Sequence, residues 1–136
     1  MIKHSFFITS LLVGLSACQS TPHAQLEDLP IKGTWYLEVV SDQPVIDYSP
    51  AQLTFEDEGK LSGNNSCNTF LGHYSLSGHT LQLRPTGNTL KACVDALTAQ
   101  EQRVVKVMPE ITHAALRKSK LLLKDADNKT LMVLSK

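Results

Sequence analysis

The chain has no excess of charge and few aromatic residues. Its 136 residues include 13 basic and 13 acidic side chains, with one tryptophan, three tyrosines and four phenylalanines. Without a net positive charge, no overall field draws the chain to nucleic acid, so we expect no nucleic-acid partner. We also expect the core to use most of the aromatic residues, which leaves little for a pocket that holds an apolar molecule.

The sequence also lacks the common motifs of catalysis and metal binding. A nucleophile elbow, a phosphate-binding loop and a cysteine cluster with metal spacing are all missing. No two of His73, His79 and His113 have the close spacing of a zinc site. The turn at Asp125 begins like a calcium loop, but Lys129 stands where an oxygen ligand is required. We therefore expect no enzymatic activity, no metal and no cofactor.

No apolar run reaches the roughly 20 residues that span a bilayer, so a permanent transmembrane helix is the weaker interpretation of the N-terminus. Residues 1–17 instead combine Lys3, an apolar run over 6–15 and a small-residue exit, which is typical of a secretory leader. The exit at 15–18 reads Leu-Ser-Ala-Cys and resembles the bacterial lipobox, whose cysteine is lipidated, for example with palmitate. Ordinary signal cleavage beside an incidental cysteine is the alternative.

This interpretation divides the chain into a lipoprotein signal peptide over 1–17, a flexible tether over 18–30 from lipidated Cys18, and one domain over 31–136. Gln19 follows Cys18 where an aspartate would favour retention in the inner membrane. We therefore expect an outer-membrane lipid anchor with the domain facing the periplasm, and exposure on the cell surface is the alternative.

Lipidation of Cys18 leaves two of the three cysteines, Cys67 and Cys93. In an oxidising envelope a reactive thiol with a second cysteine available tends to be consumed, so we expect an intramolecular disulfide. A free Cys67 that acts with His73 as a nucleophile is the alternative.

The sequence of the domain predicts many short strands and one helix. Aromatic and β-branched residues predict a strand at 34–40. Alternating apolar and polar residues predict one hairpin over 53–61 and a second over 72–83 that ends before Pro85. A polar loop at 63–68 connects the two hairpins. Three further strands are expected at 111–116, 121–123 and 131–134. Residues 95–108 predict a helix with Asp95 as its N-cap and Pro109 after its end. Its apolar stripe is expected to contain Leu97, Glu101, Val104, Val105 and Met108.

The order of these features resembles the META domain of heat-inducible HslJ-like lipoproteins. The matching positions, spread over about residues 31–135, are Trp35, Gly63, Cys67, Asn68, Gly72, Tyr74, Thr89, Ala92, Cys93 and Glu101. The two most specific matches to the family are the Gly-x-x-x-Cys-Asn pattern of the loop at 63–68 and the Thr-x-x-Ala-Cys pattern at 89–93. Ser66 departs from the pattern because the family often has glycine there, and Leu90-Lys91 departs because an apolar residue commonly precedes the alanine.

The resemblance implies an α+β domain, an antiparallel, partly open β-barrel of short strands with one helix packed across it, and a disulfide between Cys67 and Cys93. Relatives are associated with heat shock, with tolerance of novobiocin and in some cases with secretion, motility or virulence. The expected protein is a monomeric, non-enzymatic envelope lipoprotein that supports stress tolerance by binding another envelope protein or cell-wall component. A periplasmic carrier of small apolar ligands and an accessory factor for secretion or motility are the alternatives.

Overall fold

The computed structural model of the protein describes residues 26–136, so the predicted leader and Cys18 lie outside the described residues. Within that range, no helix combines the length and the apolar character needed to cross a bilayer. The helices and strands of the described chain are β1 (Gly33–Val40), β2 (Gln43–Pro44), β3 (Gln52–Phe55), η1 (Asp57–Gly59), β4 (Lys60–Asn64), β5 (Thr69–Ser77), β6 (Thr80–Asn88), α1 (Asp95–Val107), η2 (Met108–Glu110), β7 (His113–Arg117), β8 (Lys120–Lys124) and β9 (Thr130–Ser135).

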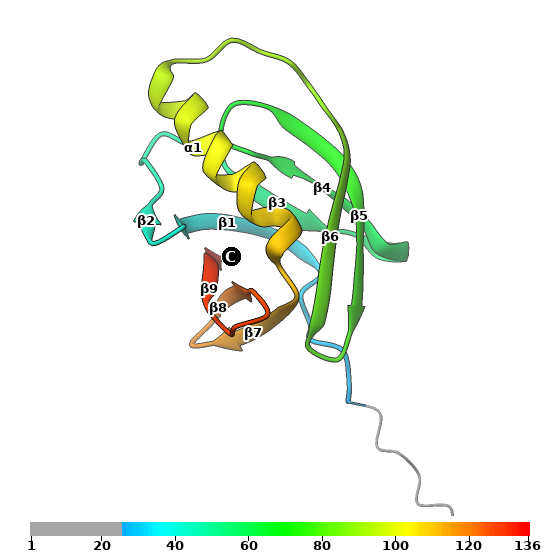
Figure 1. Cartoon of the computed structure of the whole chain (residues 1–136). Coiled ribbons are helices and arrows are strands. Elements are labelled where there is room, and N and C mark those ends of the chain that lie inside the picture. Colours follow the sequence, from blue (N-terminus) through cyan, green and yellow to red (C-terminus); the bar gives the residue numbers. More distant parts are fainter. Residues whose placement is uncertain (1–25) are drawn as a thin grey trace, which may run out of the picture.

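The strands form one antiparallel sheet that curls into a near-closed ring, with α1 lying across it (Figure 1). From β1 the order runs through β3, β4, β5, β6, β7 and β8 to β9, which pairs with β1 again, while β2 is a short extension beside β1. The predicted α+β fold with a partly open barrel and one helix is therefore confirmed, although the ring is not a regular barrel.

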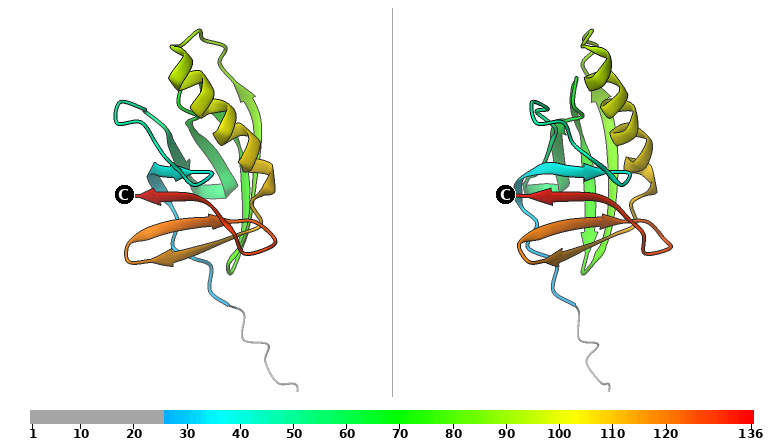
Figure 2. Two further views of the ribbon diagram at one scale, coloured as in Figure 1. Left: turned by 60° about the vertical axis from the view of Figure 1, so that its left-hand side comes forward. Right: turned by 90° about the vertical axis from the view of Figure 1, so that its left-hand side faces the viewer.

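The ring closes differently at its two seams. At the β1–β9 seam the strands pair from Tyr36 to Val40, with one bulge. At the β6–β7 seam the only residue pair in the described chain is Thr80 opposite His113. Beyond that pair, α1 and η2 lie beside the remaining length of β6 (Figure 2). The helix therefore covers the stretch that the sheet leaves open.

Large apolar side chains from both the ring and the helix fill the interior. The buried core includes Trp35, Leu53, Phe55, Leu61, Phe70, Leu81, Leu121, Leu123, Met132, Leu134, Val104, Val107, Met108 and Ile111. Trp35 satisfies its indole N–H by donating to the carbonyl oxygen of Ile31 at 2.6 Å. Because side chains alternate along a strand, Tyr36 points outward and is 53% exposed although its neighbours are buried.

The helix buries a face that the sequence predicted only in part. Val104 and Met108 are buried, as expected, together with Gln100 and Val107. Placing Val105 on this stripe was wrong, because a period of 3.6 residues groups 100, 104, 107 and 108 and leaves Val105 51% exposed.

Both ends of the helix differ from the prediction. Val94, not Asp95, is the N-cap, and no side chain caps the first turn. Asp95 is instead the first helical residue, where its carboxylate still lies near the positive end of the helix dipole. At the other end α1 stops at Val107, and Pro109 belongs to the short turn η2.

Strand β6 is longer than predicted because it continues past Pro85 to Asn88. The N–H of Leu81 points away from β5, since it donates to the carbonyl oxygen of Thr112. Pro85 is four residues further along a strand with a two-residue period, so its missing N–H falls on the same outer edge. Opposite it, Gly72 sits beside a bulge, where an added Cβ would lie 2.4 Å from the carbonyl oxygen of Arg84. Glycine is therefore required at 72.

Short polar contacts hold the N-terminal segment and the turn between β8 and β9. The N–H of Leu29 donates to the carbonyl oxygen of Gly78 at 3.1 Å, and the N–H of Gly78 donates to Asp28 at 2.6 Å. The last part of the predicted tether thus lies against the β5–β6 turn. Asp125 accepts the N–H groups of Asp127 and Lys129, which makes the 125–129 segment a hairpin turn, as predicted.

Candidate functional site

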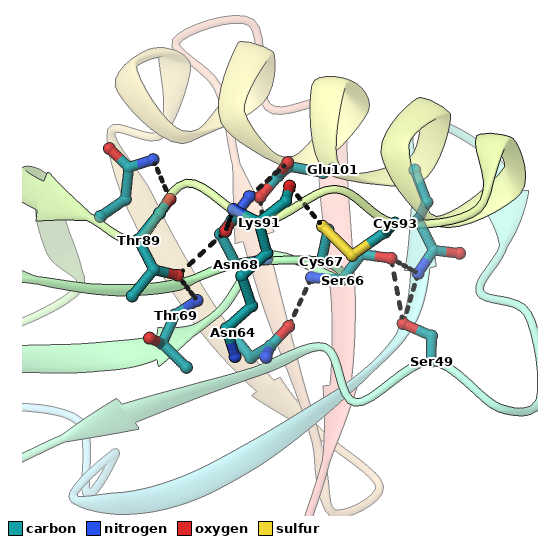
Figure 3. Close-up of a disulfide and its surroundings, with 12 residues drawn as sticks. Ser49, Asn64, Ser66, Cys67, Asn68, Thr69, Thr89, Lys91, Cys93 and Glu101 are labelled. Carbon is teal, nitrogen blue, oxygen red and sulfur yellow. Dashed lines mark hydrogen bonds between the residues drawn. A yellow bond between two sulfur atoms is a disulfide. The ribbon is translucent and has the colours of Figure 1, made fainter.

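Residues 65–68 connect β4 to β5 and are bonded covalently to the segment that enters α1. Cys67 and Cys93 form the predicted disulfide, with their Cα atoms 5.9 Å apart (Figure 3). Neither sulfur remains as a free thiol, so the alternative of a Cys67 nucleophile is wrong. His73 lies away from the loop on β5, where its partners are Lys60 and Arg84.

Asn68 is the centre of a polar cluster that we define as Asn68, Thr69, Thr89, Lys91 and Glu101, and call the Asn68 cluster (Figure 3). Its side-chain oxygen accepts hydrogen bonds from Thr89 Oγ1 at 2.9 Å and from the N–H of Lys91 at 2.7 Å. Its backbone N–H and its side-chain amide donate to the two carboxylate oxygens of Glu101, at 3.0 and 3.1 Å. One buried residue therefore joins β5, the segment after β6 and the helix.

Thr89 extends the Asn68 cluster to the end of the β5–β6 pair. Its hydroxyl oxygen accepts the N–H of Thr69 at 3.1 Å, and its own N–H donates to the carbonyl oxygen of Thr69 at 3.0 Å. The hydroxyl thus accepts from one strand while donating to Asn68. These bonds continue the β5–β6 pairing where the two strands end.

Gln100 is a second buried polar residue that the sequence analysis missed. Its side-chain amide donates to Ser49 Oγ at 2.6 Å and to Ser66 Oγ at 3.0 Å, and its side-chain oxygen accepts the N–H of Ile46 at 3.0 Å. A buried amide needs such partners because an unpaired one is costly. The sequence did contain a signal for the burial of Gln100, because it precedes Val104 by four residues and so lies on the same face of the helix.

Ser66 has a φ of 114°, a region that favours glycine. This is the position where the family often has glycine. The strain is accompanied by two contacts of its own, because Ser66 accepts from Gln100 through its hydroxyl and donates its N–H to Asn64 at 2.7 Å. Serine therefore gains a hydroxyl contact at the expense of an unfavourable backbone conformation.

The remaining motif residues do not join the Asn68 cluster. Gly63 lies in β4, where an added Cβ would stand 2.3 Å from the carbonyl oxygen of Gln52. Tyr74 donates to the carbonyl oxygen of Glu56 at 2.8 Å, and burial raises the pKa of its hydroxyl. Ala92 is exposed between Lys91 and Cys93. Of the family-motif residues outside the disulfide, Asn68, Thr89 and Glu101 are therefore the ones that meet in the Asn68 cluster.

The Asn68 cluster is built to hold structure together. Both oxygens of Glu101 are occupied by Asn68. Across residues 26–136, no group of three or more histidine, cysteine or acidic side chains is placed to hold a metal ion. The space for a ligand lies beside the cluster, in two open grooves.

The first, which we call the outer groove, has a volume of about 820 Å³ and lies on the outer face of β1, β3, β4 and β5. Its lining includes Tyr36, Gln52, Asn64, Thr69 and Leu71. The second, the helix groove, has a volume of about 680 Å³ and separates α1 from the end of β6. Both fall within the usual size range of small-molecule sites.

Comparisons with known proteins identify relatives of the fold. A search of curated proteins returns no significant match. Among solved structures, a protein determined by NMR is 25% identical, with a TM-score of 0.58 over 76% of this chain and 87% of its own. A protein from Burkholderia xenovorans is 20% identical, with a TM-score of 0.60 over 76% of this chain and 81% of its own. A DUF4847-family protein from Bacteroides vulgatus is 16% identical, with a TM-score of 0.54 over 76% of this chain and 92% of its own.

The last two likenesses concern the fold alone. The family itself is identified by sequence, because the model of the META domain matches residues 24–136 and so covers the whole ring, the helix and the disulfide. This chain belongs to the META domain family.

Proposed function

We propose that this domain is a non-enzymatic binding module of the bacterial cell envelope, which holds another envelope component on its outer surface. The observation that carries the proposal is the filled interior of the ring. Leu53, Leu81, Leu121, Leu123 and Met132 have no measurable exposure, and helix residues Val104 and Met108 pack onto the same core. A carrier that encloses its ligand needs an unfilled barrel, whereas the two grooves described above lie outside.

The position of the module in the envelope follows from the lipobox-like exit at Cys18. We propose a lipid anchor in the outer membrane, with the domain in the periplasm. Two or more acyl chains anchor a protein stably, since each buried methylene contributes about 0.8 kcal/mol. Cys18→Ala should give a precursor that takes up no radioactive palmitate. Labelling of this variant at the level of the wild type would contradict the anchor.

Binding on the outer surface is tested in living cells with a photo-crosslinking amino acid. Leu71 lines the outer groove and is 67% exposed, whereas Leu90 is 93% exposed and lines neither groove. A probe at position 71 should give a defined adduct, and the same probe at position 90 should not. Equal adducts at both positions, or none at 71, would count against a specific outer-surface partner.

We further propose that this binding supports tolerance of heat or of novobiocin, on the basis of the family resemblance. A deletion strain should grow less well than its parent under one of these stresses. The wild-type gene should restore growth, and a gene carrying Tyr36→Ala in the outer groove should restore less. Growth of the deletion strain equal to that of its parent under both stresses would contradict this role.

A second candidate function is the binding of a small apolar molecule in the helix groove. Phe70, Pro85, Val105 and Met108 line it, and Val105 is 51% exposed. The side-chain oxygen of Asn65, which also lines this groove, is buried and has no hydrogen-bond partner within residues 26–136. An apolar fluorescent dye such as N-phenyl-1-naphthylamine should bind the wild type and lose affinity in Val105→Asp. Equal dye binding by both proteins would exclude this groove.

A further inference from the structure

The outer face of β1, β3, β4 and β5 carries two rows of uncharged side chains. Residues paired across antiparallel strands point to the same face. The strand register places Tyr36, Gln52, Asn64 and Thr69 in the first row. It places Thr34, Thr54, Ser62 and Leu71 in the second. The outer groove lies over the first row, which crosses three strand spacings or about 14 Å.

The outer groove differs from the helix groove and from a hollow beside the N-terminal segment in its lack of charge. Its lining contains no lysine, arginine, histidine, aspartate or glutamate. The helix groove contains Glu101 and Lys106, and a hollow beside the N-terminal segment contains Asp28 and Lys32. Since 19% of the chain is charged and charged residues concentrate on protein surfaces, an uncharged groove of this size is a marked local deviation.

The polar groups of the first row are available to a ligand. Within the described chain, the side chains of Tyr36, Gln52 and Thr69 make no hydrogen bond. Asn64 uses its side-chain oxygen to accept from Ser66, which fixes the orientation of its amide. A free glutamine amide offers both donors and an acceptor, and a tyrosine offers a hydroxyl together with an apolar ring face.

The chemistry of this lining selects among ligand classes. A phosphate, nucleic acid or carboxylate is normally held by arginine or lysine, and the lining has neither. A purely apolar ligand would bury the Gln52 and Asn64 amides without partners, which is costly. A neutral molecule with many hydroxyl groups and some apolar faces satisfies both conditions. We propose that the outer groove binds a neutral saccharide chain of the cell envelope.

Two glycines line the groove for different reasons, and the first, Gly63, is set by packing on the inner face, which it shares with Leu53 and Phe70. Gly63 lies over the buried ring of Phe70, where a Cβ would stand 2.7 Å from a ring carbon. Any side chain at 63 would therefore displace Phe70 or the β3 backbone. Beside it, Gly87 has nothing within 4 Å of a built Cβ, so the surface stays open there.

This inference rests on the proposed function, because it names the class of envelope component that the module holds. The test uses the protein purified from its envelope in a neutral detergent. Immobilised neutral oligosaccharides of N-acetylglucosamine, glucose and mannose are the probes, with sulfated counterparts and an uncharged polar peptide as comparisons. We expect saturable binding to at least one neutral saccharide, and no greater binding to its sulfated form.

Two tyrosines provide a matched pair of variants. Tyr36 and Tyr48 are 53% and 65% exposed, and only Tyr36 lines the groove. Tyr36→Ala should weaken saccharide binding by about tenfold, the scale of a central aromatic contact, while Tyr48→Ala should not change it. Binding should also stay constant between about 50 and about 500 mM salt, because no charges are involved. The thermal midpoints of both variants should match that of the wild type, which shows that they fold.

Three outcomes would overturn the proposal. They are the absence of saturable binding to any neutral saccharide, equal binding by the wild type and Tyr36→Ala, and preference for the sulfated forms or the peptide. If any of these outcomes occurs while the photo-crosslinking probe at position 71 still gives a specific adduct in cells, the saccharide proposal is rejected and the proposed binding module stands.

Discussion

The two seams of the ring are closed by different kinds of interaction. At the β1–β9 seam, backbone pairing runs from Tyr36 to Val40, so its stability is spread over a ladder of main-chain hydrogen bonds. At the β6–β7 seam, one residue pair, Thr80 with His113, joins the strands in the described chain. The rest of that seam is closed by the helix, which is attached through the Cys67–Cys93 disulfide, the Asn68 cluster and the Gln100 contacts.

This difference has a consequence for mutational sensitivity. A ladder of backbone bonds survives the loss of any one side chain, since the backbone groups remain paired. A seam closed by side chains depends on each of them. Substitutions at the β6–β7 seam should therefore cost more stability than substitutions at the β1–β9 seam.

The largest effect is expected from a charge under the helix. Val104 is completely buried on the core face of α1, so Val104→Asp would bury a carboxylate without a partner. We expect a loss of more than about 4 kcal/mol in the free energy of unfolding, measured by urea denaturation. The neighbouring Val105, 51% exposed, is the matched control, and Val105→Asp should be close to neutral.

The milder substitution Met108→Ala removes a buried side chain at the same junction and should cost about 2 to 5 kcal/mol. It keeps the test informative if Val104→Asp does not fold. An unchanged thermal midpoint in Met108→Ala would show that the helix is not docked as described.

The second prediction concerns the disulfide, which closes a loop with a sequence separation of 26. By restricting the unfolded chain, such a crosslink stabilises the fold by about 3.5 kcal/mol in the entropy model. The double variant Cys67→Ser/Cys93→Ser should lose stability of that order. Adding reductant should lower the stability of the wild type in the same direction and leave the double variant unchanged. Two titratable thiols in denatured, unreduced mature protein would show that the bond does not form.

Periodicity allowed the elements around this seam to be predicted from the sequence. Leu81 and Leu83 alternate with polar residues, and Val104 and Met108 are one turn apart, so a strand and a docked helix face were both evident. Cysteine pairing was predictable because only two cysteines remain after Cys18 is assigned to the lipid. These signals come from neighbouring residues in the sequence or from the number of cysteines, and they do not require knowledge of which residues are in contact in the fold.

The polar contacts that close the seam were not predictable in the same way. Glu101 was expected on the apolar stripe, yet it bonds Asn68 from 33 positions away. Gln100 was passed over in favour of Val105, because hydrophobicity alone ranks valine as the buried residue. Only the folded chain brings Ser49 and Ser66 close enough to satisfy the Gln100 amide. The groove residues were hidden for the same reason, since strand register places Tyr36 and Thr69 in one row across four strands.

The third prediction tests the Asn68 cluster. Asn68→Ala removes the acceptor for the exposed Thr89 and Lys91 and the amide donor to the half-buried Glu101, so three hydrogen bonds are lost together. We expect a loss of about 1 to 3 kcal/mol in the free energy of unfolding. Asn88→Ala is the control, because Asn88 is exposed and bonds only the carbonyl oxygen of the adjacent Thr89. Equal losses in the two variants would remove Asn68 from the closure of the seam.

The smallest effect is expected at the β1–β9 seam, where Lys120 of β8 donates a hydrogen bond to Glu38 of β1. The hydrogen bond from Lys120, followed by one from Ser135, lowers the pKa of Glu38 below its ordinary value. A carboxyl whose pKa is lower in the folded state stabilises the fold above its unfolded pKa of about 4.3, and loses this contribution as the pH falls through the folded pKa.

Both side chains of the Lys120–Glu38 pair are more than a third exposed, so water and salt screen the pair. Glu38→Gln should therefore lower the thermal midpoint slightly at neutral pH, less in high salt, and progressively less as the pH falls through the lowered pKa of the folded wild-type carboxyl. A loss as large as that of Asn68→Ala, or one that persists undiminished in acid, would mean that side chains and not the backbone ladder hold this seam.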